Sequence, residues 1–586
     1  APKPPFFLRR TLLSWFERRG YKGDESMTSA LSSERAGLIA RADSLIRTGD
    51  LAAAAQAYGA VLTRWPDHVE SWFNLATLLQ SLGQVEPALR GYDQVIALRP
   101  DHVDAILNRG VALKNLGQPE AALASYDRAI GLRPDSALAY NNRGNLLKLL
   151  GRLEEARRDY DRAIALQPGY ASAHSNRGAL WADQGDFAAA LEDYECAVRS
   201  EAAQAETWFN RGNALWELQR EEEALASYAR AIALRPGYLD AMLNQGVVCK
   251  ETRRFAEALA CFETVLGWRP DFAEARFNKA MCRLQCGALT EAWPDYEARW
   301  ETSLLRNAVR PFPQPLWRGE DLAGRVILLH AEQGLGDTLN FCRYVPLVAA
   351  CGGRVVLEVQ PALRRLLSGL PGIEQLVARG DPLPPFACHC PLLSLPRLFE
   401  TTLATIPPIP AGITPSASLV AAWQARLGPA TRPRIGLVWN GSAAHRNDRH
   451  RSLSLAALAP WRTVGVELIS LQKELRPADQ AMLATWPELR HFGPELTDLA
   501  DTAALCSLMD LVISVDTSVA HLAATLGRPT WILLPHRNTD WRWLLDRTDS
   551  PWYPSATLYR QPPHDGWPLL LKQITEDLRA FTRSRL

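Results

Sequence analysis

Hydrophobic and polar positions repeat every 34 residues through the first half of the chain. Within each repeat the eighth position is glycine in five cases, the twentieth is alanine, and the twenty-fourth is tyrosine or phenylalanine. Small residues let two helices approach closely, and the aromatic ring fills the remaining space. Prolines close most of the repeats, where a helix has to end. This period is typical of stacked helix pairs, so the pattern predicts an α-solenoid of about eight repeats over residues 35–302.

The sixth position of seven successive repeats is asparagine. These residues are Asn74, Asn108, Asn142, Asn176, Asn210, Asn244 and Asn278. Packed helices lie about 8–10 Å apart and an extended peptide advances about 3.3 Å per residue, so one asparagine can serve about every third residue of a bound strand. We therefore expect the seven residues to bind the backbone of a polypeptide. The alternative is that they form hydrogen bonds within the solenoid.

The second half of the chain alternates short apolar runs with helical patterns. Strands are expected at 325–330, 354–359, 373–378, 434–439, 466–471, 511–516 and 530–535, with helices at 338–350, 361–370, 496–509 and 518–527. Such alternation predicts parallel sheets covered by helices on both faces. Proline-rich stretches suggest a connector at 303–324, an N-terminal lobe at 325–415 and a C-terminal lobe at 416–586. A cleft is expected where the carboxyl ends of the strands of the two lobes meet.

Three loops at predicted strand ends carry candidate chemistry. In the first, Gly334 and Gly336 permit a tight turn, and Asp337 stands at the start of a helix. The alternative is that Asp337 only caps that helix.

The second loop places Asp516, Thr517 and Ser518 at a strand-to-helix turn, and His521 lies one turn into the helix. Free backbone N–H groups at a helix N-terminus bind phosphate oxygens. The alternative is that these residues cap the helix and that His521 packs beneath it.

The third loop holds Trp439, Asn440 and Ser442, and an arginine-rich stretch ends at Arg451. A cationic loop can neutralise a diphosphate leaving group without a metal ion. Gln472 and Lys473 follow another strand, where Lys473 offers a positive charge or is an ordinary surface lysine. An aromatic segment, 540–552, either stacks on a nucleotide base or forms a helix that braces the lobes.

Composition narrows the classes of partner. Lysine plus arginine number 65 and aspartate plus glutamate 64, so no net charge attracts nucleic acid. The ten cysteines lack paired zinc-site spacing and are expected to be reduced core thiols of a cytoplasmic protein. No apolar run is long enough to span a bilayer. Residues 1–34 are expected to form a leader, either an amphipathic helix that contacts a partner or membrane surface or a poorly ordered segment.

The repeat resembles the tetratricopeptide repeat (TPR). The loops of the second half resemble a GT-B glycosyltransferase of two Rossmann-like lobes, specifically the group related to ADP-heptose heptosyltransferases. That resemblance covers roughly residues 325–586 and implies a metal-independent enzyme that uses a nucleotide-diphosphate or nucleotide-monophosphate sugar. It implies that Asp337 is the general base, that Thr517, Ser518 and His521 hold the phosphates, and that Lys473 assists the leaving group. The other residues expected to contact the nucleotide-sugar donor are Gly334, Gly336, Trp439, Asn440, Ser442, Arg451, Gln472 and Asp516. Ser518 departs from the glycine usual in that group, so the sugar is not assigned.

The combination of TPRs with such a catalytic half is also similar to protein O-GlcNAc transferases and to bacterial TPR glycosyltransferases that modify flagellin. This second resemblance implies transfer of a sugar to Ser or Thr of a polypeptide held in the TPR groove. Two other classes stay open: a heptosyltransferase-like enzyme of surface-glycan assembly, and a non-catalytic TPR scaffold. A homodimer is an arrangement that TPR solenoids often adopt.

Overall fold

The computed structural model describes residues 30–200, 204–442, 448–563 and 566–585. Residues 1–29, most of the predicted leader, lie outside the described residues. The described chain forms two compact units, one up to Arg220 and one from Glu221 onward. No helix among the described residues is both long and apolar enough to cross a bilayer.

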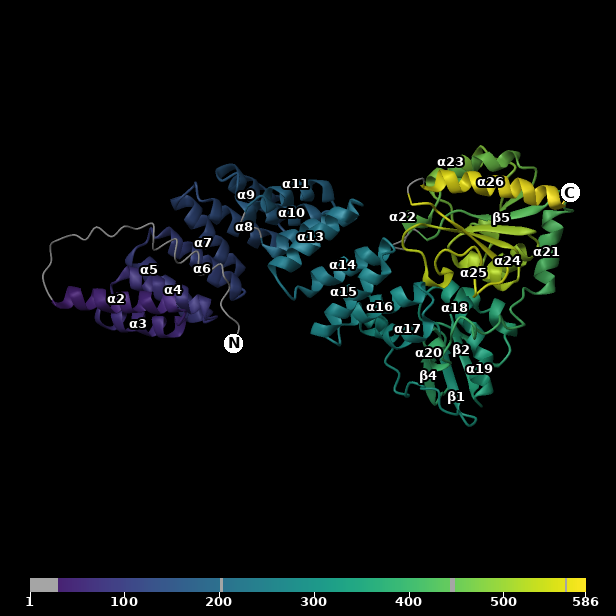
Figure 1. Ribbon diagram of the computed structural model, residues 1–586, viewed down its shortest axis with the longest axis horizontal. Helices are drawn as coiled ribbons and strands as arrows, with labels where there is room; N and C mark the ends of the chain where they lie inside the picture. Colours follow the sequence, from purple (N-terminus) through teal and green to yellow (C-terminus); the bar gives the residue numbers. More distant parts are fainter. Residues whose placement is uncertain (1–29, 201–203, 443–447, 564–565, 586) are drawn as a thin grey trace. The chain divides into compact units, whose positions relative to one another are not determined.

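The first unit consists of successive antiparallel helices (Figure 1). They are α2 (Ala30–Thr48), α3 (Leu51–Arg64), α4 (Val69–Ser81), α5 (Val85–Leu98), α6 (Val103–Asn115), α7 (Pro119–Leu132), α8 (Ala137–Leu149), α9 (Leu153–Leu166), α10 (Ala171–Asp183), α11 (Phe187–Val198) and α12 (Ala205–Glu217). The second unit begins with the same kind of helix: α13 (Glu221–Leu234), α14 (Leu239–Glu251), α15 (Phe255–Trp268), α16 (Ala273–Gln285) and α17 (Leu289–Tyr296).

The regular spacing of glycine and tyrosine packs the two helices of a repeat together. A Cβ atom added at Gly110 would lie 2.5 Å from the ring of Tyr126, and one at Gly144 would lie 2.8 Å from the ring of Tyr160. Both tyrosines are buried. The expected close approach of small residue and aromatic ring is therefore present.

The arginines that follow four of the asparagines pair with carboxylates. Arg143 reaches Asp127 at 2.6 Å and Asp159 at 2.7 Å, and Arg177 reaches Asp161 and Asp193, both at 2.7 Å. Each guanidinium group thus links the second helix of its own repeat to that of the preceding repeat. Because their charges are paired, these two arginines stabilise the stack and add no free positive charge to the solenoid surface.

Two parallel sheets follow the solenoid helices in the second unit. The first has the order β3-β2-β1-β4, from β1 (Val326–His330), β2 (Arg354–Val359), β3 (Ile373–Ala378) and β4 (Cys388–Pro391). The second has the order β10-β9-β8-β5-β6-β7, from β5 (Arg434–Val438), β6 (Glu467–Ser470), β7 (Arg490–His491), β8 (Leu511–Val515), β9 (Thr530–Leu534) and β10 (Ala556–Arg560). The predicted fold class, an α-solenoid followed by α/β lobes with parallel sheets, is confirmed.

Helices cover both sheets (Figure 1). Those of the first lobe are α18 (Leu335–Phe341), α19 (Val345–Ala350) and α20 (Leu395–Leu398), and those of the second are α21 (Ala417–Leu427), α22 (Asp448–Arg451), α23 (Pro477–Ala484), α24 (Leu499–Ser507), α25 (Ser518–Thr525) and α26 (Gly566–Arg585).

Two of the predicted helices are not continuous α-helices in the structure. The segment 338–350 is interrupted by a 3₁₀ turn between α18 and α19, because Pro346 has no N–H to continue the α-helical hydrogen bonds. The segment 361–370 forms only two 3₁₀ turns, Pro361–Leu363 and Leu366–Gly369. The second turn ends at Gly369, which lies against the backbone of Gly412, and Leu370 is extended.

The last solenoid helices belong to the same hydrophobic core as both lobes. The Trp293 indole is 2% exposed, donates a hydrogen bond to the Thr401 carbonyl at 2.8 Å, and packs against Trp541 with ring centres 5.7 Å apart. Arg299, which is fully buried, pairs with Glu332 at 3.0 Å in the loop after β1. Burial raises the pKa of Glu332 to about 7. The end of the solenoid is therefore a structural part of the α/β half.

The glycine–tyrosine packing predicts a difference between two identical substitutions in one repeat. Gly110→Ala adds a methyl group against Tyr126, whereas Gly131→Ala, in α7, adds one where no atom lies within 4 Å. Both variants gain the higher helix propensity of alanine, so this gain cancels in the comparison. The remaining difference in unfolding free energy is the cost of overpacking Tyr126, about 1–3 kcal/mol. Urea unfolding of the full chain, followed by circular dichroism, should show a lower midpoint for Gly110→Ala than for Gly131→Ala. Equal midpoints would contradict the tight packing.

Candidate functional site

A cleft of about 950 Å³ lies at the carboxyl ends of strands from both sheets of the second unit. Its walls come from the loops after β1, β5, β6, β8 and β9, and from the solenoid helices α14 and α16. The residues predicted to be catalytic or donor-binding all line it except Trp439; those that line it are Gly334, Gly336, Asp337, Asn440, Ser442, Arg451, Gln472, Lys473, Asp516, Thr517, Ser518 and His521.

Asp337 stands in the first turn of α18. Its Oδ2 accepts a hydrogen bond from the Gly334 N–H at 2.8 Å, and its Oδ1 accepts one from the guanidinium group of Arg542. The carboxylate therefore does cap the helix, and its side chain also remains 19% exposed in the cleft. Burial raises the pKa of Asp337, and the positive charge of Arg542 opposes that rise.

The first and second loops are in direct contact. A Cβ atom added at Gly336 would lie 2.6 Å from Cδ2 of His521. Glycine at this position thus lets α18 of one lobe approach α25 of the other. Asp337 and His521 are 184 residues apart in the sequence, but their two loops meet at one place in the cleft.

His521 is held in an aromatic setting. It is 6% exposed, its Nδ1 lies 3.0 Å from the Tyr553 hydroxyl, and its ring stacks on Trp543 with centres 5.1 Å apart. Burial lowers the pKa of His521 to about 3, and the nearby Arg542 contributes to the decrease. The imidazole is therefore neutral at physiological pH.

The N-terminus of α25 opens into the same cleft. Thr517 is its N-cap, and its hydroxyl lies 3.0 Å from the Ser514 hydroxyl without capping the helix. The first backbone hydrogen bond of the helix comes from the Ala520 N–H to the Thr517 carbonyl, so the N–H groups of Ser518 and Val519 precede it. This arrangement is suited to binding an anion.

The two predicted cationic side chains, Arg451 and Lys473, line the cleft. Arg451 packs over Gly441 and donates a hydrogen bond to the Asp516 carbonyl at 2.8 Å. Lys473 is exposed and donates to the Thr497 carbonyl at 3.1 Å. The Asp516 carboxyl group is the acidic neighbour: burial raises its pKa to about 7, and Asp540 adds to the rise.

A buried network of hydrogen bonds supports the third loop. Trp439 is fully buried and donates to Asp479 at 3.1 Å, while Asn440 donates to the same carboxylate at 2.9 Å and accepts a hydrogen bond from Gln472 at 2.8 Å. The prediction that Trp439 contacts a nucleotide was wrong, because its ring belongs to the hydrophobic core of the C-terminal lobe. Asn440 and Gln472 do line the cleft, with their side-chain amides engaged in this network.

Two parts of the chain match known families. Residues 39–102, 74–137, 107–171, 182–238 and 250–304 match the tetratricopeptide repeat, and residues 494–557 match glycosyltransferase family 9 (heptosyltransferase). The chain thus combines segments that match the TPR with a segment that matches glycosyltransferase family 9. That segment contains Thr517, Ser518 and His521, as well as Arg542.

Protein FlbA from Caulobacter vibrioides is 28% identical over 343 residues, which cover 51% of this chain and 54% of FlbA. The chain thus spans about half the length of this curated relative. Among solved structures, MamA is 25% identical over 27% of this chain and 92% of its own, with a TM-score of 0.25. YrrB, described as a TPR protein with an unusual peptide-binding site, is 23% identical over 31% of this chain and 94% of its own, with a TM-score of 0.29.

Sequence reasoning missed the importance of Arg542 within the family 9 segment. Residues 541–543 form a 3₁₀ turn, so the bracing helix considered for this aromatic segment is absent. Trp541, Trp543 and Trp552 are nonetheless buried in the core that the lobes share. Arg542 is 3% exposed and pairs with Asp337 and Asp540. Its position between Trp541 and Trp543 was visible in the sequence, but its partner in the other lobe was not.

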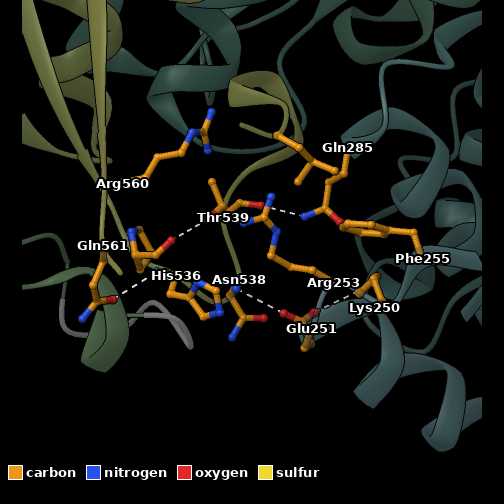
Figure 2. A pocket seen from close by; sticks show the side chains of 12 residues that line it. Lys250, Glu251, Arg253, Phe255, Gln285, His536, Asn538, Thr539, Arg560 and Gln561 are labelled. Carbon is orange, nitrogen blue, oxygen red and sulfur yellow. Dashed lines mark hydrogen bonds and ion pairs between the residues drawn. The ribbon is translucent and has the colours of Figure 1, made fainter. Parts of the chain in front are cut away.

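The solenoid residues of the cleft were also missed. Lys250 and Glu251, at the end of α14, and Gln285, at the end of α16, line it. Figure 2 shows Glu251 and Gln285 facing the segment after β9, where the Asn538 N–H donates to Glu251 at 3.1 Å and Gln285 donates to the Thr539 carbonyl at 2.9 Å. Lys250 pairs with Glu251 at 3.1 Å. Only the three-dimensional packing brings these helix ends to the loops that line the cleft.

The predicted peptide-binding asparagines are all partly exposed. Some form hydrogen bonds within the protein: Asn74 donates to the Tyr58 hydroxyl at 3.0 Å, and Asn176 donates to Asn141 at 2.9 Å. Asn278 accepts a hydrogen bond from Lys250 at 3.0 Å, which connects the last asparagine to a residue that lines the cleft. Internal hydrogen bonding therefore accounts for part of the repeated asparagine, and peptide binding stays a prediction.

The low pKa of His521 predicts a pH-dependent contribution to local stability. An unfolded histidine titrates near 6.5, so acidification favours the unfolded state between that value and about 3. The contribution lost between pH 7 and pH 5 is about 2 kcal/mol. We therefore compare the free energy of local opening in wild type with that in His521→Asn. The difference between the two proteins should fall by about 2 kcal/mol between pH 7 and pH 5.

Hydrogen exchange of peptides covering α25, corrected for intrinsic rates, measures this difference. Asp516 is present in both proteins, so its opposite pH dependence cancels. Between pH 7 and pH 8 the difference should stay nearly constant. A difference independent of pH from 5 to 8 would show that His521 is not held neutral.

Proposed function

We propose that this protein is a glycosyltransferase that transfers a sugar from a nucleotide-sugar donor to Ser or Thr of a polypeptide held in the TPR groove. The observation that carries the proposal is one cleft with three contributions: Asp337 from one lobe, the N-terminus of α25 from the other, and Lys250 and Gln285 from the solenoid. The family 9 match over residues 494–557 supports glycosyl transfer.

Displacement at the anomeric carbon of a sugar requires a base for the incoming hydroxyl group and stabilisation of the departing phosphate. In the proposed reaction Asp337 takes the proton of the acceptor hydroxyl. The N–H groups of Ser518 and Val519, with Arg451 and Lys473, stabilise the leaving phosphate oxygens. These donors supply the stabilisation without a metal ion, so we propose metal-independent transfer by a GT-B enzyme.

The acceptor part of the proposal rests on the solenoid. TPRs favour a peptide or protein partner, and the asparagine row ends at Asn278, whose partner Lys250 lines the cleft. A polypeptide bound along the last repeats would thus be directed to Asp337. Flagellin is the acceptor suggested by the similarity to TPR glycosyltransferases, and a cytoplasmic location is part of the same proposal.

The family 9 match, described as heptosyltransferase, favours a second candidate: an enzyme of surface-glycan assembly. In that case the TPRs would recruit an assembly partner. The two candidates differ in the product, which is a glycan on protein in the first and a glycan on lipid in the second.

Asp337→Asn should reduce sugar transfer by at least about 100-fold while leaving donor binding nearly unchanged, because it removes the base but keeps the shape of the side chain. Transfer is measured with purified protein, acceptor and radiolabelled nucleotide sugar, and donor binding by calorimetry. Asp271→Asn, an exposed residue before α16 that does not line the cleft, is the matched control. Full activity of Asp337→Asn would refute the base, and absence of binding by any nucleotide sugar would favour a non-catalytic scaffold.

The asparagine row should contribute to acceptor binding through several small increments. A hydrogen bond contributes about 0.5–1.5 kcal/mol, so single substitutions should change the acceptor KM little. The triple variant Asn108→Ala, Asn142→Ala and Asn210→Ala should raise it at least about tenfold without changing donor binding. Asn115→Ala, an exposed asparagine at the end of α6, is the control. An unchanged acceptor KM in the triple variant would remove the peptide-binding role.

A further inference from the structure

We propose that Arg542 is a positioning residue that holds the Asp337 carboxylate in the orientation and ionisation state needed to accept a proton. The proposal rests on the proposed function, in which Asp337 is the base. It concerns a residue of the C-terminal lobe that acts on the base of the N-terminal lobe.

Both Nη atoms of the Arg542 guanidinium group bind a carboxylate. One Nη atom contacts Asp337 Oδ1, and the other donates to Asp540 Oδ2 at 2.7 Å. Asp540 Oδ1 also accepts a hydrogen bond from the Arg542 backbone N–H at 2.9 Å. Asp540 therefore sets both the turn that carries Arg542 and the direction of its side chain.

Aromatic rings restrict the same group further. The guanidinium carbon lies 5.0 Å from the ring centre of Phe341 and 4.8 Å from that of Trp541. Phe341 is four residues after Asp337 on α18, so it lies on the same helix face as the base. Arg542 is thus held against α18 by an ion pair and by ring contact, and movement of either helix or turn would separate them.

Asp337 is left with a defined orientation. Its Oδ2 is held by the Gly334 N–H and its Oδ1 by Arg542, while the side chain still lines the cleft. Each carboxylate oxygen has two lone pairs, so one on each oxygen remains for a proton. The two contacts fix the plane of the carboxylate without occupying all its acceptor sites.

The charges around Asp337 come from several elements. Asp540 and Arg542 face it from the loop after β9, and Glu332 lies in its own loop; the phenol of Tyr296, on α17, and the neutral His521, on α25, are also near. Asp516 belongs to the adjacent turn of the cleft. Burial and Asp540 raise the pKa of Asp337, and Arg542 is the main opposing charge. Loss of Arg542 should therefore leave the base protonated at higher pH.

The test is the pH dependence of kcat for sugar transfer by the full chain. Arg542→Met should move the acid limb of the profile upward by about 1–3 pH units, whereas Asp540→Asn should move it downward. Arg542→Lys keeps a charge without the planar fork and should fall between wild type and Arg542→Met. Opposite shifts by the two neighbours would not arise from a general loss of structure.

The control is Arg547→Met, because Arg547 forms a similar pair with Asp549 at 2.6 Å but does not line the cleft. Its profile should match that of wild type. A uniform loss of kcat in both Arg542 variants, with the acid limb unmoved, would overturn the positioning role.

Failure of the proposed function would look different, because wild type itself would then transfer no sugar. The proton affinity of Asp337 is measurable in that case by hydrogen exchange of peptides covering α18, as the difference in opening free energy between wild type and Asp337→Asn. The pH at which this free-energy difference changes should be higher when both proteins also carry Arg542→Met. An identical titration in both backgrounds would overturn the proposal without any substrate.

Discussion

A buried ion pair between Asp337 and Arg542 joins the two lobes, and it sets the orientation of the candidate base in the cleft. Both groups are largely removed from water, so each needs the other: removal of one partner of a buried pair costs about 3–5 kcal/mol. The pair lies beside the contact between Gly336 and His521, where a side chain larger than hydrogen has no room. Together these contacts bring a candidate base to within reach of a helix N-terminus suited to phosphate.

The end of the solenoid is built into the same arrangement. Trp293 packs on the turn that carries Arg542, and Arg299 pairs with Glu332 in the loop that leads to Asp337. Gln285 and Glu251 bind the backbone of the segment after β9. The last solenoid helices therefore support the loops that carry Asp337 and Arg542, and they line the cleft. For this reason the proposed function takes a polypeptide bound along these helices as the acceptor.

Much of this organisation could be predicted because it has a local signal. The period of 34 residues defined the repeats, and glycine or Asp-Thr-Ser at strand ends marked the loops that line the cleft. Trp439 was expected to contact the donor, but its indole is buried and donates a hydrogen bond to Asp479. The sequence does not show that partner. Arg542 and Lys250 were missed because their roles arise from partners in distant segments. The segment 361–370 forms two 3₁₀ turns instead of the expected helix, and its contact with Gly412 through Gly369 is one that periodicity does not show.

In the proposed function the cleft transfers a sugar to a protein guided there by the repeats. Intact-mass spectrometry can compare the proteins of cells with and without this chain. We expect one abundant protein to gain the mass of one or more sugar residues only when the chain is present. Unchanged protein masses, together with a change in a lipid-linked glycan, would contradict it.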